Sequence, residues 1–194
     1  MELDQELVGE FVLAAHFNFP KVQALYQQHP ALLDATWQKF NERAIEAASH
    51  MGARSIAEFL LERGAPMSIF IAAMLGDTEQ VARYLEADPA LAGSKGVHGI
   101  TILYHAALSG KTEIADLLVE RGGGVGANDA LHAAVKFGHL EMVKWLLAHG
   151  VDEVNALNFD KKTPLQVTLE RGYDEIAALL RAKGGQESAD EQAD

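Results

Sequence analysis

The sequence contains no cysteine, and this absence excludes two kinds of chemistry. Among 194 residues there is no thiol that could build a disulfide framework or act as a nucleophile. The absence fits a reducing compartment, so we expect a cytoplasmic protein. The first eleven residues, MELDQELVGEF, are acidic where a secretory signal peptide would be basic. No apolar run approaches the length of a membrane span, so we expect no contact with membrane.

Positive charge is also scarce. The chain has 16 Lys and Arg residues against 28 Asp and Glu residues, which gives a net charge of −12. This balance repels nucleic acid and anionic membrane surfaces, and it mildly favours a basic or neutral partner. We therefore expect no nucleic acid among the partners.

The clearest structural unit is the stretch from 128 to 150, NDALHAAVKFGHLEMVKWLLAHG. Asp129 can cap a short helix that Gly138 then breaks. A second apolar pattern at helical spacing follows, and Gly150 can end that helix in a left-handed conformation. Neither helix is long enough to be stable alone, so each is expected to pack against copies of itself.

Copies of this unit are present along the whole chain. The residue between the two helices is, in order, Asn18, Gly52, Gly76, Gly110, Gly138 and Gly172. A large apolar residue lies seven positions before each, and a small one lies four positions before it. Recurring glycine indicates a positive φ, a conformation that asparagine also tolerates, so Asn18 is expected to share it. The pattern predicts six repeats.

Three segments carry a resemblance to a known family. Residues 163–166 (TPLQ), 129–134 (DALHAA) and 101–106 (TILYHA) resemble the ankyrin T-P-L-H-x-A signature. The tails LLERG at 60–64 and LLAHG at 146–150 resemble the leucine pair and glycine that end an ankyrin repeat. The resemblance covers about residues 9–184, and the irregular repeat lengths resemble bacterial ankyrin proteins.

This resemblance implies an all-α solenoid of about six helix-turn-helix repeats, with short or poorly formed β-hairpin fingers. A single domain is expected over residues 1–184, followed by an acidic tail at 185–194 without fixed structure. The expected repeats are approximately 1–33, 34–66, 67–92, 93–125, 126–153 and 154–184.

The connections between repeats alternate in length. Successive turn positions are 34, 24, 34, 28 and 34 residues apart. By resemblance, the long connections at 34–41, 93–101 and 152–163 form the fingers, although the first lacks a recognisable finger motif and Lys161 replaces the usual turn glycine of the third. The finger residues expected to bind a partner are Trp37, Phe40, Val97, His98, Asn158 and Phe159. For Trp37 and Phe40 a second interpretation stays open, in which they only pack their own loop.

The two positions before each turn residue face the concave groove in ankyrin-like stacks. The candidate groove residues at or beside these positions are Phe17, His50, Met51, Met74, Leu75, Leu108, Lys136 and Phe137. An exposed apolar stripe of this kind indicates a contact surface. The alternative is that these side chains fold under the finger loops and complete the core.

Eight histidines raise the question of metal or catalytic chemistry. No H-E-x-x-H motif and no cysteine–histidine pairing is present, so we expect no metal site and no cofactor. By resemblance, His132 and His139 are structural, with the His132 imidazole bonded to loop backbone. The glycine run at 122–126 lacks the Lys-Ser/Thr of a phosphate loop and is interpreted as an inter-repeat turn. Trp145 is expected in the core.

The sequence therefore predicts a non-enzymatic scaffold that binds another protein through its concave groove and fingers. Two alternatives stay open. In the first, the apolar stripe contacts its own copy, so the chain is a homodimer rather than a monomer. In the second, the groove holds a small-molecule or catalytic site that uses His16, His50 and Lys136, which occupy matching repeat positions.

Overall fold

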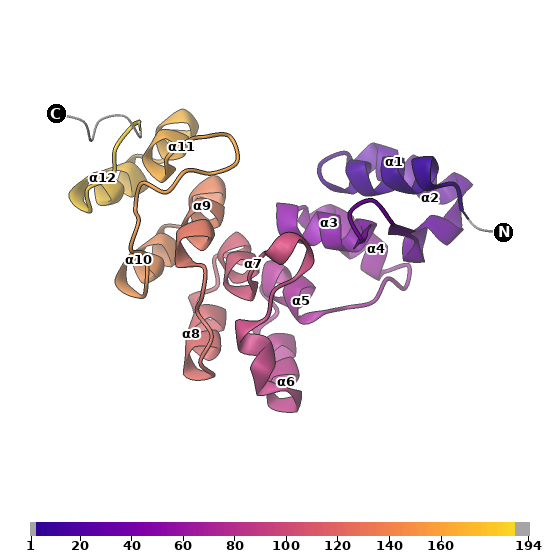
Figure 1. Ribbon diagram of the computed structural model, residues 1–194, viewed down its shortest axis with the longest axis horizontal. Coiled ribbons are helices and arrows are strands. Elements are labelled where there is room, and N and C mark those ends of the chain that lie inside the picture. The colour runs from indigo at the N-terminus through magenta and orange to yellow at the C-terminus, as the bar shows by residue number, and fades with distance from the viewer. Residues whose placement is uncertain (1–2, 189–194) are drawn as a thin grey trace.

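The computed structural model of the protein describes residues 3–188 and consists of helix pairs stacked side by side (Figure 1). In this part of the chain the first helices of the pairs, called inner helices below, are α1 (Gln5–Ala15), α3 (Ala44–Met51), α5 (Ile69–Leu75), α7 (Ile102–Ser109), α9 (Ala127–Phe137) and α11 (Pro164–Arg171). The second, outer helices are α2 (Phe19–Gln28), α4 (Arg54–Leu61), α6 (Thr78–Ala87), α8 (Thr112–Glu120), α10 (Leu140–Ala148) and α12 (Asp174–Ala182). The prediction of an all-α solenoid of six repeats is confirmed.

The turn inside each pair follows the expected geometry at the glycines. Gly52, Gly76, Gly138 and Gly172 have φ of 72° and Gly110 has φ of 73°, in the left-handed region that glycine enters without a Cβ penalty. For Asn18 the prediction was wrong. Its φ is −117°, and it instead caps α2, because its side-chain oxygen accepts a hydrogen bond of 3.1 Å from the Lys21 amide.

The core lies between the inner and outer helices. The small residue four positions before each turn is at most 4% exposed in every repeat: Ala14, Ala48, Ala72, Ala106, Ala134 and Thr168. These small side chains let neighbouring inner helices approach closely. Leucines of the outer helices fill the space behind them, and Leu60, Leu118, Leu146 and Leu180 are fully buried. Each such leucine contributes about 1.5–3 kcal/mol by leaving water.

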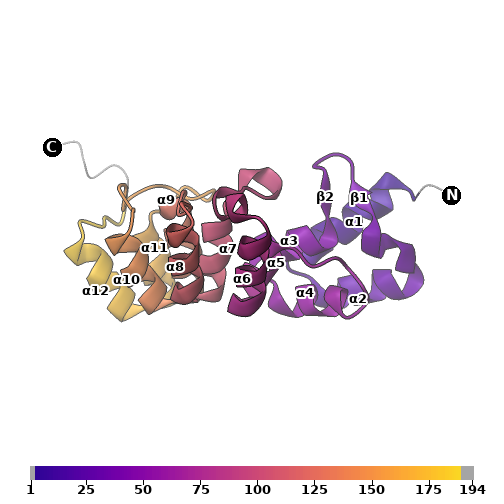
Figure 2. The same ribbon diagram turned by 90° about the horizontal axis from the view of Figure 1, so that it is seen from below.

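The helix pairs follow an arc, with α1–α2 and α11–α12 at its two ends (Figure 1). The outer helices line one edge, and the finger loops project on the opposite side (Figure 2). Short 3₁₀ segments, η1 (Pro30–Asp34), η2 (Pro89–Gly93) and η3 (Val97–Gly99), lie in the long connections. No helix within residues 3–188 has the length and apolar character needed to cross a membrane.

The first finger is better formed than the sequence predicted. Strands β1 (Thr36–Trp37) and β2 (Glu42–Arg43) pair in antiparallel fashion, with Thr36 opposite Arg43. The second finger has a single bridge between Lys95 and Thr101. In the third, the described chain forms a turn without a strand, in which the Asn158 carbonyl accepts a 3.0 Å hydrogen bond from the Lys161 amide.

The first residues of the predicted tail contact the third finger. The Gln186 amide donates a 2.8 Å hydrogen bond to the Asn155 side chain, and the Gln186 carbonyl accepts one of 2.6 Å from the Thr163 hydroxyl. These bonds attach the chain after α12 to the last finger. Residues 189–194, the rest of the predicted tail, lie outside the described part of the structure.

Candidate functional site

The predicted groove residues divide into three groups by burial. Met74 (2% exposed), Leu108 (5%) and His50 (8%) are buried, so the prediction that they are groove surface was wrong for these three. They pack inside the stack, as the alternative interpretation held. Phe17 is 78% exposed and Phe137 is 37% exposed. Met51, Leu75 and Lys136 are intermediate.

A contact between the second and fifth repeats covers the middle of the apolar stripe predicted for the concave side. The Lys136 ammonium donates a 3.3 Å hydrogen bond to the Met51 carbonyl. Beside it, the Phe137 ring lies over Gly52, where an added Cβ would come within 2.7 Å of the ring. Burial lowers the pKa of Lys136, and the nearby Arg171 charge lowers it further. The groove is therefore not a continuous apolar strip.

The finger residues also differ from one another. The Trp37 indole packs on α1 at Gly9, where a Cβ would lie 2.7 Å from the ring, so Trp37 anchors its own hairpin. Phe40 remains 46% exposed, and Phe159 is fully exposed at the third finger. Val97 and Asn158 are half-buried, and His98 is exposed with a positive φ of 58°.

Under the first two fingers, the structure gathers a group of ionisable side chains, of which the sequence indicated His16 and His50 but not Glu42. His16 at the end of α1, Glu42 on β2 and His50 near the end of α3 place one nitrogen or oxygen each within 4.8 Å of one another. The Glu42 carboxylate accepts a 2.7 Å hydrogen bond from His50 Nε2. These three residues are called the His–Glu cluster below, and they are the ones that could hold a metal ion.

The pKa values in the His–Glu cluster follow from burial and mutual charge. Burial lowers the pKa of His16, and the His50 ring adds to this, while the hydrogen bond to the Val12 carbonyl opposes it. Burial alone would raise the pKa of Glu42. The hydrogen bond from His50 and the charges of the surrounding imidazoles outweigh burial, so the pKa lies below its ordinary value. Glu42 is thus held as a carboxylate.

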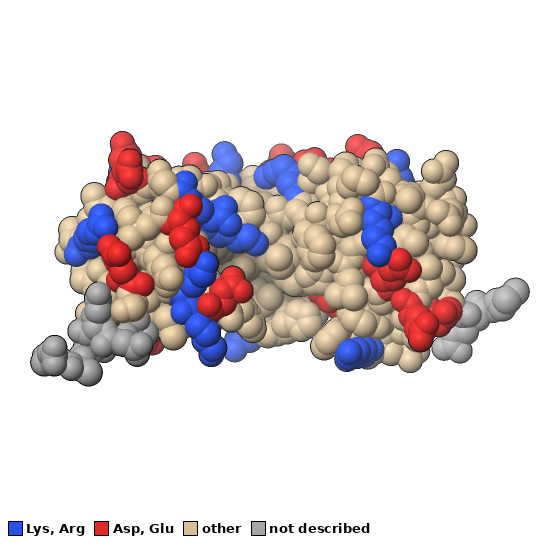
Figure 3. Space-filling view, turned by 90° about the horizontal axis from the view of Figure 1, so that it is seen from above, with Lys and Arg blue, Asp and Glu red and all other residues tan. Residues whose placement is uncertain are grey.

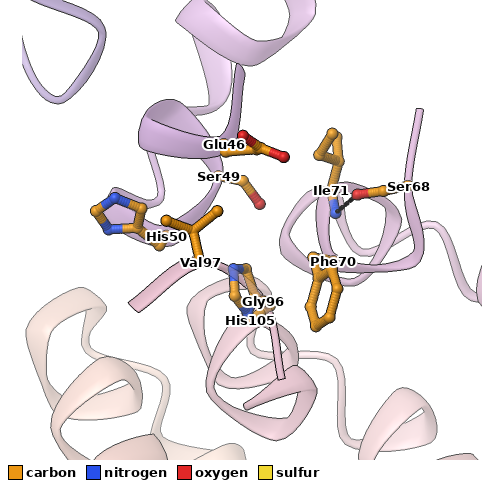
Figure 4. A pocket seen from close by; sticks show the side chains of 9 residues that line it. All are labelled: Glu46, Ser49, His50, Ser68, Phe70, Ile71, Gly96, Val97 and His105. Atoms are coloured by element: carbon orange, nitrogen blue, oxygen red, sulfur yellow. Dashed lines mark hydrogen bonds between the residues drawn. The ribbon is translucent and has the colours of Figure 1, made fainter. Parts of the chain in front are cut away.

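Next to the cluster is a cavity of about 20 Å³, lined by nine residues from α3, α5, α7 and the second finger (Figure 4). The Ser49 hydroxyl lines it and is buried without a hydrogen-bond partner in the described chain. A space of this size holds about one water molecule. It is too small for an organic substrate, so the geometry gives no support to a catalytic site around His50.

Two other histidines have the roles that the resemblance implied. His132 Nε2 donates a 2.7 Å hydrogen bond to the Ala156 carbonyl in the third finger. His139 Nε2 donates one of 3.0 Å to the Leu108 carbonyl and covers Gly110. Trp145 is half-buried against the core, and its indole N–H donates a 2.7 Å hydrogen bond to Asp116. These contacts join neighbouring repeats.

Charge is unevenly spread over the side toward which the arc opens (Figure 3). Lys, Arg, Asp and Glu side chains gather toward the two ends of this face, and much of its middle is uncharged. An uncharged area bordered by charged side chains is common in surfaces that contact another macromolecule.

Comparison with known proteins agrees with this architecture. The model of the family "Ankyrin repeats (3 copies)" matches residues 69–152 and 123–191, together more than half of the chain. The mouse Nuclear factor NF-kappa-B p105 subunit is 33% identical over 92 residues, which are 44% of this chain and 10% of that protein. Mouse Protein phosphatase 1 regulatory subunit 27 is 32% identical over 111 residues, 55% of this chain and 71% of that protein.

A third relative is the Transient receptor potential cation channel subfamily A member 1 homolog of Caenorhabditis elegans, 39% identical over 95 residues, 44% of this chain and 8% of that protein. The chain thus spans about a tenth of the length of the p105 subunit and of this channel. What the relatives share with it is the repeat. The chain belongs to the ankyrin-repeat family, whose repeats are protein-interaction modules.

Proposed function

We propose that this protein is non-catalytic and binds a partner protein through apolar side chains on its inner helices and fingers. The distribution of exposed large apolar side chains carries this proposal. Nine such residues are exposed in the described chain; Val119 lies on the outer helix α8, and Val125 lies in the short connection between α8 and α9. The other seven lie on inner helices, in the turn after α1 or in fingers: Leu13, Phe17, Phe40, Phe137, Leu157, Phe159 and Leu169.

Five of these seven residues lie in the first or the last repeat, and so form separate surfaces at the two ends of the arc. Leu13 and Phe17 are four residues apart and lie on one side of α1 and its C-terminal turn, as the N-terminal apolar pair. Leu157 and Phe159 in the third finger, with Leu169 on α11, make a C-terminal apolar group. The Lys136–Met51 contact lies between them. A partner that reaches both surfaces must therefore bridge the middle.

The physical properties of the solenoid suit this function. Its binding surface is built on packed helices, so little conformational entropy is lost when a partner docks. Phe17 and Phe159 are the strongest anchor candidates, because 78% of the Phe17 surface and the whole of the Phe159 side chain are exposed and would leave water on binding. The net charge of −12 favours a basic or neutral partner through salt-dependent encounter. The similarity to a phosphatase regulatory subunit supports a protein as the partner.

Site-specific photo-crosslinking tests the proposal. A photoreactive amino acid at position 17 or 159 of the full chain is expected to give a defined adduct in lysate of the source cells. The matched control carries the same group at position 83 on α6, where an outer helix is exposed. Equal adducts from all three positions would contradict the proposal. An adduct between two copies of this chain would instead support the homodimer.

The affinity for the captured partner then tests whether Phe17 is an anchor. We expect Phe17→Ala to weaken binding by about 1–3 kcal/mol. Val119→Ala removes an apolar group that is also exposed (42%) but lies on α8, and we expect it to leave the affinity unchanged. Equal effects of the two substitutions would remove the inner-helix surface from the proposal.

A further inference from the structure

The carboxylate of Glu42 is in an unusual position for an acidic side chain. Only 2% of it is exposed, and a buried carboxylate needs compensation by a cation or by hydrogen bonds. Within residues 3–188 its ion-pair partners are both histidines. His50 Nε2 lies 2.7 Å and His98 Nε2 lies 3.4 Å from the same oxygen, Oε1.

A third imidazole completes the surroundings of this carboxylate. The rings of His16 and His50 are 5.0 Å apart between centroids, and those of His50 and His98 are 5.4 Å apart. A hydrogen bond to Glu42 requires only one imidazole. Three converge here, and they come from α1, α3 and η3, elements that are far apart in the sequence.

The spacing of the donor atoms approaches that of a metal site. Tetrahedral zinc with bonds of about 2.0–2.1 Å holds its ligand atoms about 3.3 Å apart. One donor atom each from His16, Glu42 and His50 already lies within 4.8 Å of the others. Small side-chain rotations, with the 2.7 Å hydrogen bond between Glu42 and His50 opening slightly, are enough to bring the atoms to ligand spacing.

The orientation of His16 adds an independent argument. Its Nδ1 lies 3.0 Å from the Val12 carbonyl oxygen, which can only accept a hydrogen bond. The proton of the neutral ring is therefore on Nδ1, and Nε2 keeps its lone pair. Metal-binding histidines commonly donate their other ring N–H to a backbone carbonyl in this way, which fixes both the tautomer and the ring.

We propose that His16, Glu42 and His50 bind one zinc ion, with His98 as the fourth ligand. A set of imidazoles and one carboxylate suits zinc, whereas calcium and magnesium prefer oxygen ligands throughout. The half-exposed His98 side chain, with 37% of its surface accessible, provides the route by which the ion enters. With four protein ligands the site is closed, so the ion is structural rather than catalytic.

Such an ion would link two inner helices directly to the first two fingers. Its ligands tie the inner helices α1 and α3 to β2 in the first finger and to η3 in the second. Zinc would therefore fix the two fingers over the N-terminal half of the concave side. This inference does not depend on the proposed partner, because it concerns only residues within the chain.

Zinc titration of the purified full chain, after treatment with a chelator, tests the site. In competition with a chromogenic chelator we expect one zinc ion per chain. His16→Gln is expected to weaken zinc binding by at least about a hundredfold, at or beyond the upper end of the range seen for groups that only orient a ligand. The matched control is His29→Gln, at the end of α2 and outside the cluster, which is expected to bind zinc like the unmodified chain.

Two further measurements distinguish the loss of a zinc ligand from the loss of the fold. Circular dichroism of His16→Gln checks that the helices are retained. Cobalt added to the unmodified chain is expected to give the intense visible bands of tetrahedral coordination, a readout that needs no variant. Absence of zinc binding at micromolar concentration, equal affinity of His16→Gln and the unmodified chain, or weak octahedral cobalt bands would each overturn the proposal.

Discussion

The Lys136 ammonium donates a hydrogen bond to the Met51 carbonyl oxygen, with 3.3 Å between the two atoms, although 85 residues separate them in the chain. The bond connects the ends of α9 and α3, which belong to the fifth and second repeats. Between them the chain passes through both short inter-repeat connections, where turn positions are only 24 and 28 residues apart. The arc is thus bent tightly enough for its concave side to contact itself.

The contact at Gly52 can be measured against a control turn of the same geometry. Gly52 and Gly172 both have φ of 72°, but an added Cβ at Gly52 would lie 2.7 Å from the Phe137 ring, whereas at Gly172 nothing lies within 4 Å. We expect Gly172→Ala to cost about 1–2 kcal/mol, the penalty for a left-handed alanine. Gly52→Ala should cost more by the steric overlap with Phe137, as measured by urea unfolding.

A second substitution separates the cost of a left-handed alanine from the cost of steric overlap with Phe137. Adding Phe137→Ala to Gly52→Ala removes the overlapping ring, so the double variant should show a favourable coupling energy. Adding it to Gly172→Ala should give additive effects, because nothing lies within 4 Å of a Cβ at Gly172 and the two side chains do not touch. Additivity in both pairs would mean that Phe137 does not press on Gly52 in solution.

The hydrogen bond from His132 to the third finger gives another prediction. Its 2.7 Å bond to the Ala156 carbonyl is a contact between an inner helix and the loop of the next repeat. We expect His132→Ala to lower stability by about 0.5–1.5 kcal/mol, the usual contribution of one such bond. Amide exchange of the neighbouring finger, at Lys161 and Lys162, should become faster. Unchanged exchange there would show that His132 does not hold the loop.

The stack of repeats was predictable because it depends on local sequence signals that recur along the chain. Turn glycines, small residues and leucine pairs recur in step with the helices, so the six repeats and the role of His132 followed from the sequence. The His–Glu cluster was not predictable. Its ligands come from α1, β2 and α3, and no short spacing motif links them. The matching repeat positions of His16 and His50 indicated only that these two side chains lie on the same side of the stack.

The burial of side chains along the concave side could not be predicted from the repeat pattern either. Met74 and Leu108 share a repeat position with Glu170, yet Glu170 is exposed and the other two are buried. Trp37 and Gly9 show the same limit, because the indole occupies the space left by a glycine on another element. A repeat pattern predicts which face of each helix packs against the stack. It does not predict how strongly the stack curves, and so which side chains on the concave side become buried.

His105 predicts a pH dependence of stability. It is 3% exposed, and burial lowers its pKa from 6.5 to about 4, although the hydrogen bond to the Thr101 carbonyl opposes this. In the unfolded chain the imidazole binds its proton near pH 6.5. Between pH 6.5 and about 4 the unfolded state therefore binds a proton that the folded state does not, so stability is full above 6.5 and falls as the pH decreases through this window.

The loss should reach at most about 3 kcal/mol, at about 1.4 kcal/mol for each pH unit of that window. Urea unfolding with chelator present, at pH 7 and at pH 4.5, measures it. His105→Gln serves as the comparison, because the contributions of His16 and His132, whose pKa values are also lowered by burial, remain in both chains. An equal pH dependence of the two chains would contradict the assignment to His105.

Lys161 predicts a substitution that increases stability. It has φ of 59° in the turn of the third finger, a left-handed conformation that a residue with a Cβ adopts at a cost of about 1–2 kcal/mol. The equivalent position of the second finger, eleven residues before its turn glycine, is Gly99, with φ of 73°. Lys161→Gly removes the strain, while the greater freedom of glycine in the unfolded chain offsets part of the gain.

We expect Lys161→Gly to increase the free energy of unfolding by about 0.5–1 kcal/mol, measured by urea unfolding. Lys161→Val, with a branched Cβ in the same conformation, should decrease stability. If glycine and valine lower stability alike, the Lys161 side chain itself, rather than its backbone conformation, supports the finger.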